Sequence, residues 1–219
     1  GLFLIILSVV DLFFTKFIKY KILHVALLLI GTGVVGKIMA QEAINLGRSP
    51  GYEPDQPIKF SHKIHAGENK IACDYCHTGV TKSRYASIPP ASMCLNCHNV
   101  IRSGLNTGET EIDKIHKYVD EGKPVAWIKV HNLPDHVFFS HAQHVAVGKI
   151  DCKTCHGDVA TMGRIQQVTD LSMGWCINCH RDTKVNFDNK YYSSYKQHEE
   201  LSTGKISKVT VEDIGGSNC

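Results

Sequence analysis

The longest uncharged apolar stretch of the chain lies near its N-terminus. Residues 22–36 (ILHVALLLIGTGVVG) carry no formal charge at neutral pH, and extension to Ala40 gives about the 20 residues with which an α-helix crosses a bilayer. Three lysines, at positions 16, 19 and 21, precede the stretch, and nothing comparably basic follows closely. We therefore predict a transmembrane helix over residues 22–40, with the N-terminal flank in the cytoplasm and the rest of the chain in the periplasm. A buried helix of a soluble protein is the alternative.

The segments on either side of this stretch differ from it in composition. Residues 1–21 are an apolar segment, interrupted by Asp11, that ends in the basic flank. They could be the remnant of a first helix or the core of a signal peptide. His24 inside the predicted span could contact a cofactor, a quinone or a neighbouring chain. Residues 41–59 contain three prolines and two glycines, which is typical of an extended linker.

Beyond the linker, the apolar positions show little periodicity. The exception is the segment 109–121, where Ile112, Ile115 and Val119 form the apolar stripe of a short helix, and a glycine and a proline follow directly. We expect a mostly α and irregular fold, with an N-terminal transmembrane helix and otherwise little regular secondary structure.

Composition excludes some classes of protein. The 219 residues are 43% hydrophobic and 21% charged with a net charge of +3, which argues against disorder. No run of basic residues is longer than a dipeptide, which argues against a nucleic-acid partner. The unusual counts are nine cysteines and thirteen histidines.

Eight of the nine cysteines fall in four copies of the pattern C-x-x-C-H. This pattern is the attachment signature of c-type haem: two thiols one helical turn apart form thioethers with the haem, and the next histidine is then held beneath the iron. The cysteines are Cys73, Cys76, Cys94, Cys97, Cys152, Cys155, Cys176 and Cys179, and the histidines that follow are His77, His98, His156 and His180.

Other uses of paired cysteines explain the pattern less well. Structural zinc sites also use C-x-x-C pairs, but they do not account for a histidine directly after every second cysteine. A thioredoxin-like redox centre needs one such motif rather than four, and disulfides leave the histidines unexplained. The four motifs therefore predict covalently bound haem c.

The haem motifs belong to an internal duplication. The phrase F-S-H-x-x-H occurs at residues 60–65 and again at 139–144, and the same shift along the chain relates Cys73 to Cys152. We expect two dihaem modules, 60–98 and 139–180, joined by a connector, 99–138. Six-coordinate haem needs a second axial ligand, so the candidate distal ligands are His62, His65, His141 and His144, with His131 as a candidate for a further haem. Surface histidines and methionine ligation are the alternatives.

The last segment, residues 181–219, ends on Cys219. A chain that stops on the first cysteine of a fifth C-x-x-C-H motif would have this sequence, and an ordinary terminal thiol is the alternative. Because the chain also begins within an apolar stretch, we treat it as part of a longer protein.

Several long phrases of the chain resemble one family. From about residue 16 onward, the sequence is similar to the multihaem (pentahaem) cytochrome c subunit of bacterial alternative complex III. The similarity is carried by FSHKIHAGEN at 60–69, SIPP at 87–90, VHNLPDHVFFSH at 130–141 and MGWCINCHR at 173–181. Each half is also remotely similar to the class III multihaem cytochromes.

The resemblance implies an electron-transfer subunit of a quinol-oxidising respiratory complex in the bacterial inner membrane. Family members have an N-terminal anchor and five haems. They pass electrons from the quinol and iron–sulfur side to a monohaem subunit, a soluble cytochrome c or a terminal oxidase. Only four motifs are complete here, and Cys219 would begin the fifth. The chain would then hold no substrate site of its own. Two rival hypotheses are a stand-alone tetrahaem quinol dehydrogenase that feeds a periplasmic reductase and a multihaem reductase with a five-coordinate iron.

Overall fold

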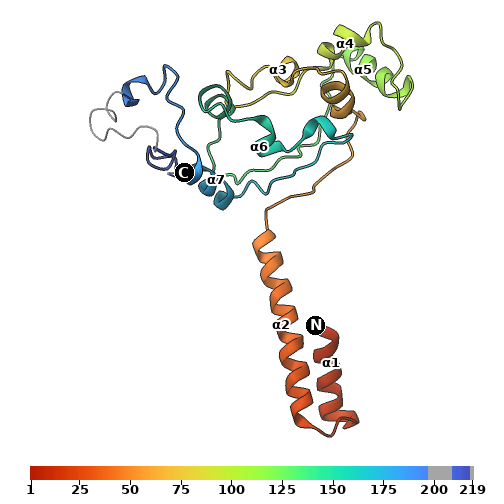
Figure 1. The fold of residues 1–219 in the computed structure, drawn as a ribbon. Helices are drawn as coiled ribbons and strands as arrows, with labels where there is room; N and C mark the ends of the chain where they lie inside the picture. Colours follow the sequence, from red (N-terminus) through yellow and green to blue (C-terminus); the bar gives the residue numbers. More distant parts are fainter. Residues whose placement is uncertain (197–208, 218–219) are drawn as a thin grey trace. The chain divides into compact units, whose positions relative to one another are not determined.

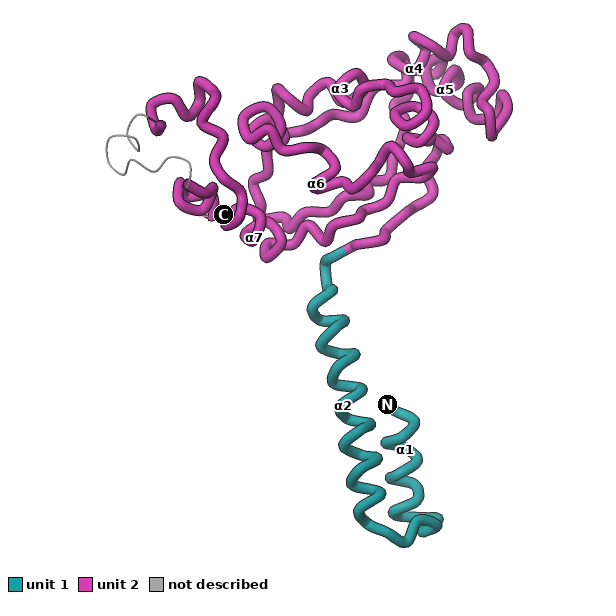
Figure 2. The backbone as a smooth tube through the Cα atoms, viewed as in Figure 1, with its two compact units in different colours: residues 1–48 teal, residues 49–219 magenta. Residues whose placement is uncertain are grey.

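The computed structural model describes residues 1–196 and 209–217, and the chain divides into two compact units (Figure 2). Unit 1 comprises Gly1–Arg48 and unit 2 comprises Ser49–Cys219. The division between them falls inside the segment whose composition predicts a linker, residues 41–59.

Unit 1 is a helical hairpin (Figure 1). Helix α1 (Leu2–Val10) continues into a π-helical turn, η1 (Asp11–Thr15), after which the chain reverses into α2 (Lys21–Asn45). The two helices meet closely at Gly31, where a Cβ atom would lie 2.6 Å from Cγ1 of Ile5. A residue without a side chain is needed for this approach, as at many helix contacts inside membranes.

Helix α2 is the one helix within the described residues that is long and apolar enough to cross a membrane. Only 11% of its most apolar window is buried, and large side chains such as Leu29 and Ile38 are exposed. The core helix of a soluble protein would bury such a stretch, so the exposure suggests membrane anchoring. The helix continues to Asn45 instead of ending at Ala40, because residues 41–43 (QEA) are good helix formers.

Unit 2 consists of short helical segments connected by long irregular chain (Figure 1). The prediction of a mostly helical and irregular fold is confirmed: the described residues contain no strand, only two isolated β-bridges, of which one joins Lys184 to Thr210. The segments are η2 (Lys63–Glu68), α3 (Cys73–Cys76), α4 (Ala91–His98), α5 (Thr110–Asp120), η3 (Ala142–Val147), α6 (Cys152–His156), η4 (Val159–Thr161) and α7 (Met173–Asp182).

The protein core of unit 2 is small. Within the described residues, the buried apolar side chains are Ile58, Ile112, Ile115, Val130, Met162, Leu171 and Phe187. A domain of roughly 150 residues normally buries about two thirds of its surface around a continuous apolar core. Unit 2 therefore needs another source of apolar surface in its interior.

The duplication of the sequence is repeated in the backbone. Lys70 and Lys149, at equivalent positions of the two copies, both adopt a left-handed conformation, with φ of 56° and 57°. The next amide in each copy, of Ile71 and of Ile150, donates to the carbonyl of His65 or His144 at 3.0 Å. Each copy thus folds the H-x-x-H phrase into the same π-helical turn, η2 or η3.

The two copies pack against each other reciprocally. The amide of Lys63, in η2, donates to the carbonyl of Met162, after the third motif, at 2.8 Å. The equivalent amide of Ala142, in η3, donates to the carbonyl of Ser83, after the first motif, at 3.1 Å. The donors occupy the same position in the two copies, and each acceptor follows the first haem motif of the other copy. The modules are therefore arranged around a local pseudo-twofold relationship.

Candidate haem-binding sites

Each C-x-x-C-H motif lies on a short helix or directly at its end. Helices α3, α4, α6 and α7 carry the four motifs, and one helical turn places the two cysteines of a pair on the same face. Two of the helices begin with a side-chain cap: Asp151 accepts from the amide of Lys153 at 2.8 Å, and Ser172 accepts from the amide of Trp175 at 3.2 Å. The caps fix where the helices that carry the third and fourth motifs begin.

The H-x-x-H histidines lie opposite the motif histidines. The ring centroids are 6.1 Å apart for His65 and His98, and 6.1 Å for His144 and His180. The rings of His141 and His156 are 6.4 Å apart and nearly parallel, at 7°. Two imidazoles bound to opposite sides of one metal ion, with metal–nitrogen distances of about 2 Å, have ring centres about 6 Å apart. The observed spacings therefore fit an iron atom between each pair.

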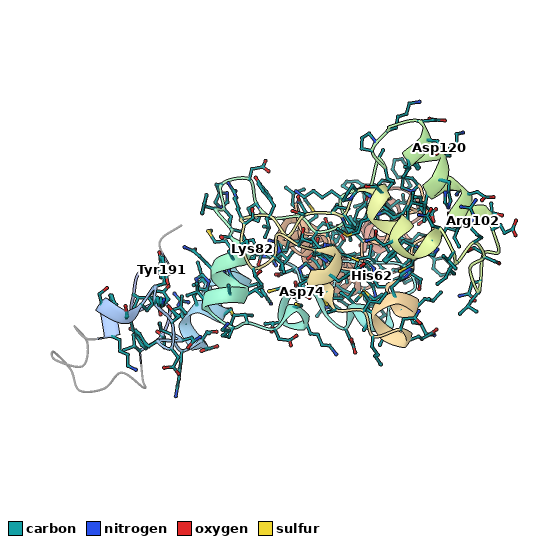
Figure 3. All side chains as sticks on the ribbon, turned by 90° about the horizontal axis from the view of Figure 1, so that it is seen from above. His62, Asp74, Lys82, Arg102, Asp120 and Tyr191 are labelled. Atoms are coloured by element: carbon teal, nitrogen blue, oxygen red, sulfur yellow. The ribbon has the colours of Figure 1, made fainter. Side chains whose placement is uncertain are left out.

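His62 occupies the equivalent place in the first module. In Figure 3 it lies inside the view, on the same side as Asp74, whereas Arg102, Asp120 and Tyr191 lie closer to the edges of the view. Burial, and next to it the nearby His77, lowers the pKa of His62 to about 4. Of the other residues, His77 has the largest electrostatic effect on His62, which associates these two histidines.

The ring nitrogens of these histidines are arranged for metal binding. A backbone carbonyl can only accept, so a ring Nδ1 beside one must carry the proton, and Nε2 is then left with a lone pair. Six of the eight histidines have such a carbonyl at Nδ1: Ser61 for His65, Ser87 for His77, Ile101 for His98, Arg84 for His141, Ser140 for His144 and Gly216 for His180, at 2.5 to 3.0 Å. Hydrogen bonds from Nδ1 to a carbonyl are the ones that orient metal-bound histidines.

Burial keeps several of these imidazoles neutral. It lowers the pKa of His156 to about 4, with His131 and His141 contributing, and it lowers the pKa of His144. A neutral imidazole is the form that binds a metal.

The thiols form a row across unit 2. Burial raises the pKa of Cys94, and the nearby thiol of Cys76 contributes. Burial also raises the pKa of Cys76, with a contribution from Cys97. Burial and the nearby Cys73 raise the pKa of Cys152. At the far end, burial raises the pKa of Cys155 to about 11, and the next contributions come from Cys179 and Cys176. The spatial order of the motifs is therefore second, first, third, fourth.

The side chains of the described residues do not form direct metal sites. Among the residues that the structure describes, no group of three or more His, Cys, Asp or Glu side chains is placed to hold a metal ion. A zinc site of cysteines and histidines would need such a group, whereas haem supplies four ligands of its own and takes only two from the protein. The apolar faces of haem also suit the small protein core. The residues present thus fit haem c.

His131 lies in a position that the sequence does not reveal. Its Nε2 is 3.1 Å from Nδ1 of His156, and the two rings meet edge to face with centroids 4.4 Å apart. The Nε2 atom that a ligand would offer to iron is thus directed at another histidine. Cys219, the candidate start of a fifth motif, lies outside the described residues.

Several residues that matter for this arrangement carry no sequence signal. The six carbonyl acceptors belong to the backbone, so any residue type could supply them. Gln167 is another such residue: it is completely buried, its Oε1 accepts from the amide of Asn132 at 2.9 Å, and its Nε2 donates to the carbonyl of Thr169 at 2.9 Å. Gln167 thereby holds the chain next to His131. The spacing of glutamine residues in the sequence gives no indication of this role.

Comparison with known proteins agrees with this interpretation. Residues 137–204 match the family described as cytochrome c7 and related cytochrome c. Over 151 residues, the chain is 36% identical to the menaquinone reductase, multiheme cytochrome c subunit, of Nitratidesulfovibrio vulgaris strain Hildenborough. The match covers 66% of this chain and 63% of that relative, which is less than two thirds of its length. Residues 137–204 thus resemble a cytochrome c domain, and the chain is similar to a multihaem cytochrome c subunit, a class of protein whose chemistry is electron transfer.

Proposed function

We propose that this chain is the electron-transfer subunit of a quinol-oxidising respiratory complex of the alternative complex III type, with its haem domain on the periplasmic side of the bacterial inner membrane. The observation that carries the proposal is the row of four motifs with a second histidine opposite the motif histidine. In three of the four pairs, the ring centroids are 6.1 to 6.4 Å apart. The similarity of the phrases around these histidines to the multihaem cytochrome subunit of that complex supports the choice of complex.

In this proposal, the eight cysteines of the four motifs anchor haem c through thioethers. The proximal ligands are His77, His98, His156 and His180. The distal ligands face them, as His62 to His77, His65 to His98, His141 to His156 and His144 to His180. When bound, haem supplies reversible one-electron chemistry, and two imidazole ligands leave no open coordination position for a substrate.

The protein contributes orientation and exclusion of water. Carbonyls at Nδ1 fix the ring planes of six histidines, and partial burial of His62 and His156 limits the access of solvent to the middle of the row. The second and fourth motifs lie at the two ends, where partner subunits would exchange electrons with the chain. The partners we propose are an iron–sulfur subunit, a monohaem cytochrome, and a cytochrome c or terminal oxidase as acceptor.

A fifth haem would extend the row beyond the fourth motif. Glu212 forms an ion pair with Arg181 at 3.1 Å, and the Gly216 carbonyl accepts from Nδ1 of His180 at 2.5 Å. These contacts hold the chain that leads to Cys219 against the fourth motif. We therefore propose that Cys219 begins the fifth motif and that the complete protein carries five haems.

Intact-mass measurement of the native chain tests the cofactor. The expected result is a mass equal to the polypeptide plus four haems for residues 1–219, and five for a protein that continues through a complete fifth motif. A colourless protein, or a mass that equals the polypeptide plus zinc, would refute the proposal.

A second candidate is a membrane-bound multihaem cytochrome that exchanges electrons with quinone without the other subunits of alternative complex III. The similarity to a multihaem cytochrome c subunit of a menaquinone reductase favours it. The two candidates differ when the purified, haem-loaded chain is mixed with a menaquinol analogue in detergent. A conduit within a larger complex stays oxidised, whereas a quinol dehydrogenase is reduced, as the visible spectrum of its haems would show.

A further inference from the structure

The two central sites of unit 2 differ at one atom, Nδ1 of the motif histidine. The duplication makes the first and third motifs equivalent, so that His77 corresponds to His156. Nδ1 of His77 donates to the carbonyl of Ser87 at 2.7 Å. Nδ1 of His156 instead lies 3.1 Å from Nε2 of His131. His131 comes from the connector, which has no counterpart in the duplication, so it is the residue that breaks the symmetry between these sites.

Hydrogen bonds from distant parts of the chain fix the position of His131. The ring is edge to face with His156, with an interplanar angle of 82°, and its Nε2 lies 3.1 Å from Nδ1 of His156. The next residue, Asn132, has its amide bound to Oε1 of the completely buried Gln167. The amide of Gln167 donates to the carbonyl of Tyr52 at 3.1 Å, and the carbonyl of Gln167 accepts from the amide of Gly51 at 2.6 Å. Chain segments far apart in sequence thus fix the position of His131.

Iron bound at the third motif would set the direction of the hydrogen bond between His156 and His131. If His156 offers Nε2 to iron, its proton is on Nδ1, and His131 must accept with Nε2. An acceptor at Nδ1 increases the basicity of a metal-bound imidazole and fixes the plane of its ring.

We propose that His131 is a positioning residue for the third haem site, which orients His156 and lowers the reduction potential of that one site, and that it is not itself a haem ligand. The inference rests on the proposed function, since it assumes haem bound at the third motif. A stronger donor imidazole stabilises the ferric state, so the bond from His156 to His131 lowers the potential of the third site relative to the same site without an acceptor at Nδ1.

The test compares three variants of the haem-loaded full chain. His131→Phe removes the acceptor and keeps a ring, His131→Gln restores an acceptor through its amide oxygen, and His136→Gln is a control at an exposed histidine of the same connector. The readouts are haem content by intact mass, the spin state of each haem by electron paramagnetic resonance, and a spectroscopic redox titration.

We expect all three variants to keep every haem low-spin and covalently bound. In His131→Phe, one component of the titration moves to a more positive potential. His131→Gln returns it towards the wild-type value, and His136→Gln leaves every component in place. A high-spin haem in both His131 variants would show that His131 is a ligand, and an unchanged titration in His131→Phe would show that the bond has no effect; either result would overturn the inference. Absence of haem from the wild-type protein would instead refute the proposed function.

Discussion

Asp11 and His24 form a buried contact between the two helices of unit 1, with Oδ2 of Asp11 3.0 Å from Nε2 of His24. Both side chains are less than a tenth exposed. The same carboxylate accepts from the amides of Phe17 and Ile18, at 2.8 and 2.9 Å, and from the hydroxyl of Thr15 at 2.5 Å. Asp11 therefore satisfies two backbone amides where the hairpin turns.

Replacement of Asp11 tests this role. In Asp11→Ala the amides of Phe17 and Ile18 lose their acceptor, and we expect their hydrogen exchange in lipid nanodiscs to become faster, on the order of tenfold or more. Asp11→Asn keeps an oxygen acceptor, so the exchange rates of these amides should lie between those of wild type and of Asp11→Ala. Equal protection of both amides in wild type and Asp11→Ala would contradict the role.

Removal of one distal histidine should change one haem only. Because His65 faces His98 and His144 faces His180, His65→Ala and His144→Ala should each convert a single haem to a high-spin form that binds cyanide, with the haem count unchanged. His136→Ala serves as the control. The prediction fails if either variant stays fully low-spin, or if two haems change together.

Haem should act as part of the core of unit 2. The double variant Cys94→Ala, Cys97→Ala, at the second motif, should lose one haem by intact mass and retain the other three, because this motif lies at an end of the row. The same change at Cys152 and Cys155, in the middle, should lower the stability of the whole unit, since the buried apolar side chains are few. The measurement is the midpoint of thermal unfolding, followed by the Soret band. Similar midpoints for the two variants would argue against this prediction.

The pH dependence of stability should include a contribution from Glu111. Its carboxylate accepts from the amide of Lys59 at 2.8 Å and from Nζ of Lys114 at 2.7 Å. Burial opposes ionisation, but these bonds outweigh it and lower the pKa of Glu111 below its usual 4.5. A lowered acidic pKa stabilises the folded state above pH 4.5, and this stabilisation is lost as the pH falls through the folded value.

Comparison of wild type with Glu111→Gln checks this sign. At pH 7 we expect the variant to unfold a few degrees lower, about 2–4 °C for each kcal/mol lost in a domain of this size. The difference should shrink as the pH falls below 4.5 and through the lowered pKa of Glu111 in the folded state. Asp113→Asn, on the same helix, is the matched control. A difference that grows at low pH would have the wrong sign.

The repeated local patterns predicted much of the fold. The uncharged stretch at 22–36 predicted a long apolar helix, and the stripe of Ile112 and Ile115 predicted α5, observed at Thr110–Asp120. Periodic patterns of this kind predict structure well because they depend on neighbouring residues only. Segment 1–14, left open by its composition, is helical because it packs against α2 through Gly31, a contact that no local pattern contains.

The candidate site divides in the same way. The spacing of Cys73, Cys76 and His77 predicts haem attachment, because thiols one turn apart and the following imidazole act within a single helix. The pairing of His65 with His98 could not be read from the sequence, because it depends on how η2 packs against α4. The contact of His131 with His156 was equally hidden, since the connector reaches the third motif only in the folded chain.

The sequence by itself thus determined the chemistry available to this protein: four sets of thiols and imidazoles with the spacing of haem c, and an apolar helix that suggests a membrane anchor. Only the tertiary structure decided which imidazoles face each other, in what order the motifs follow one another, and which Nδ1 atoms meet carbonyls or a histidine. The physical reason is the separation along the chain of the residues that specify each feature. Covalent attachment is specified within a single C-x-x-C-H motif, whereas the environment of a ring can be made by segments far away along the chain, such as Arg84 beside His141 and Gly216 beside His180.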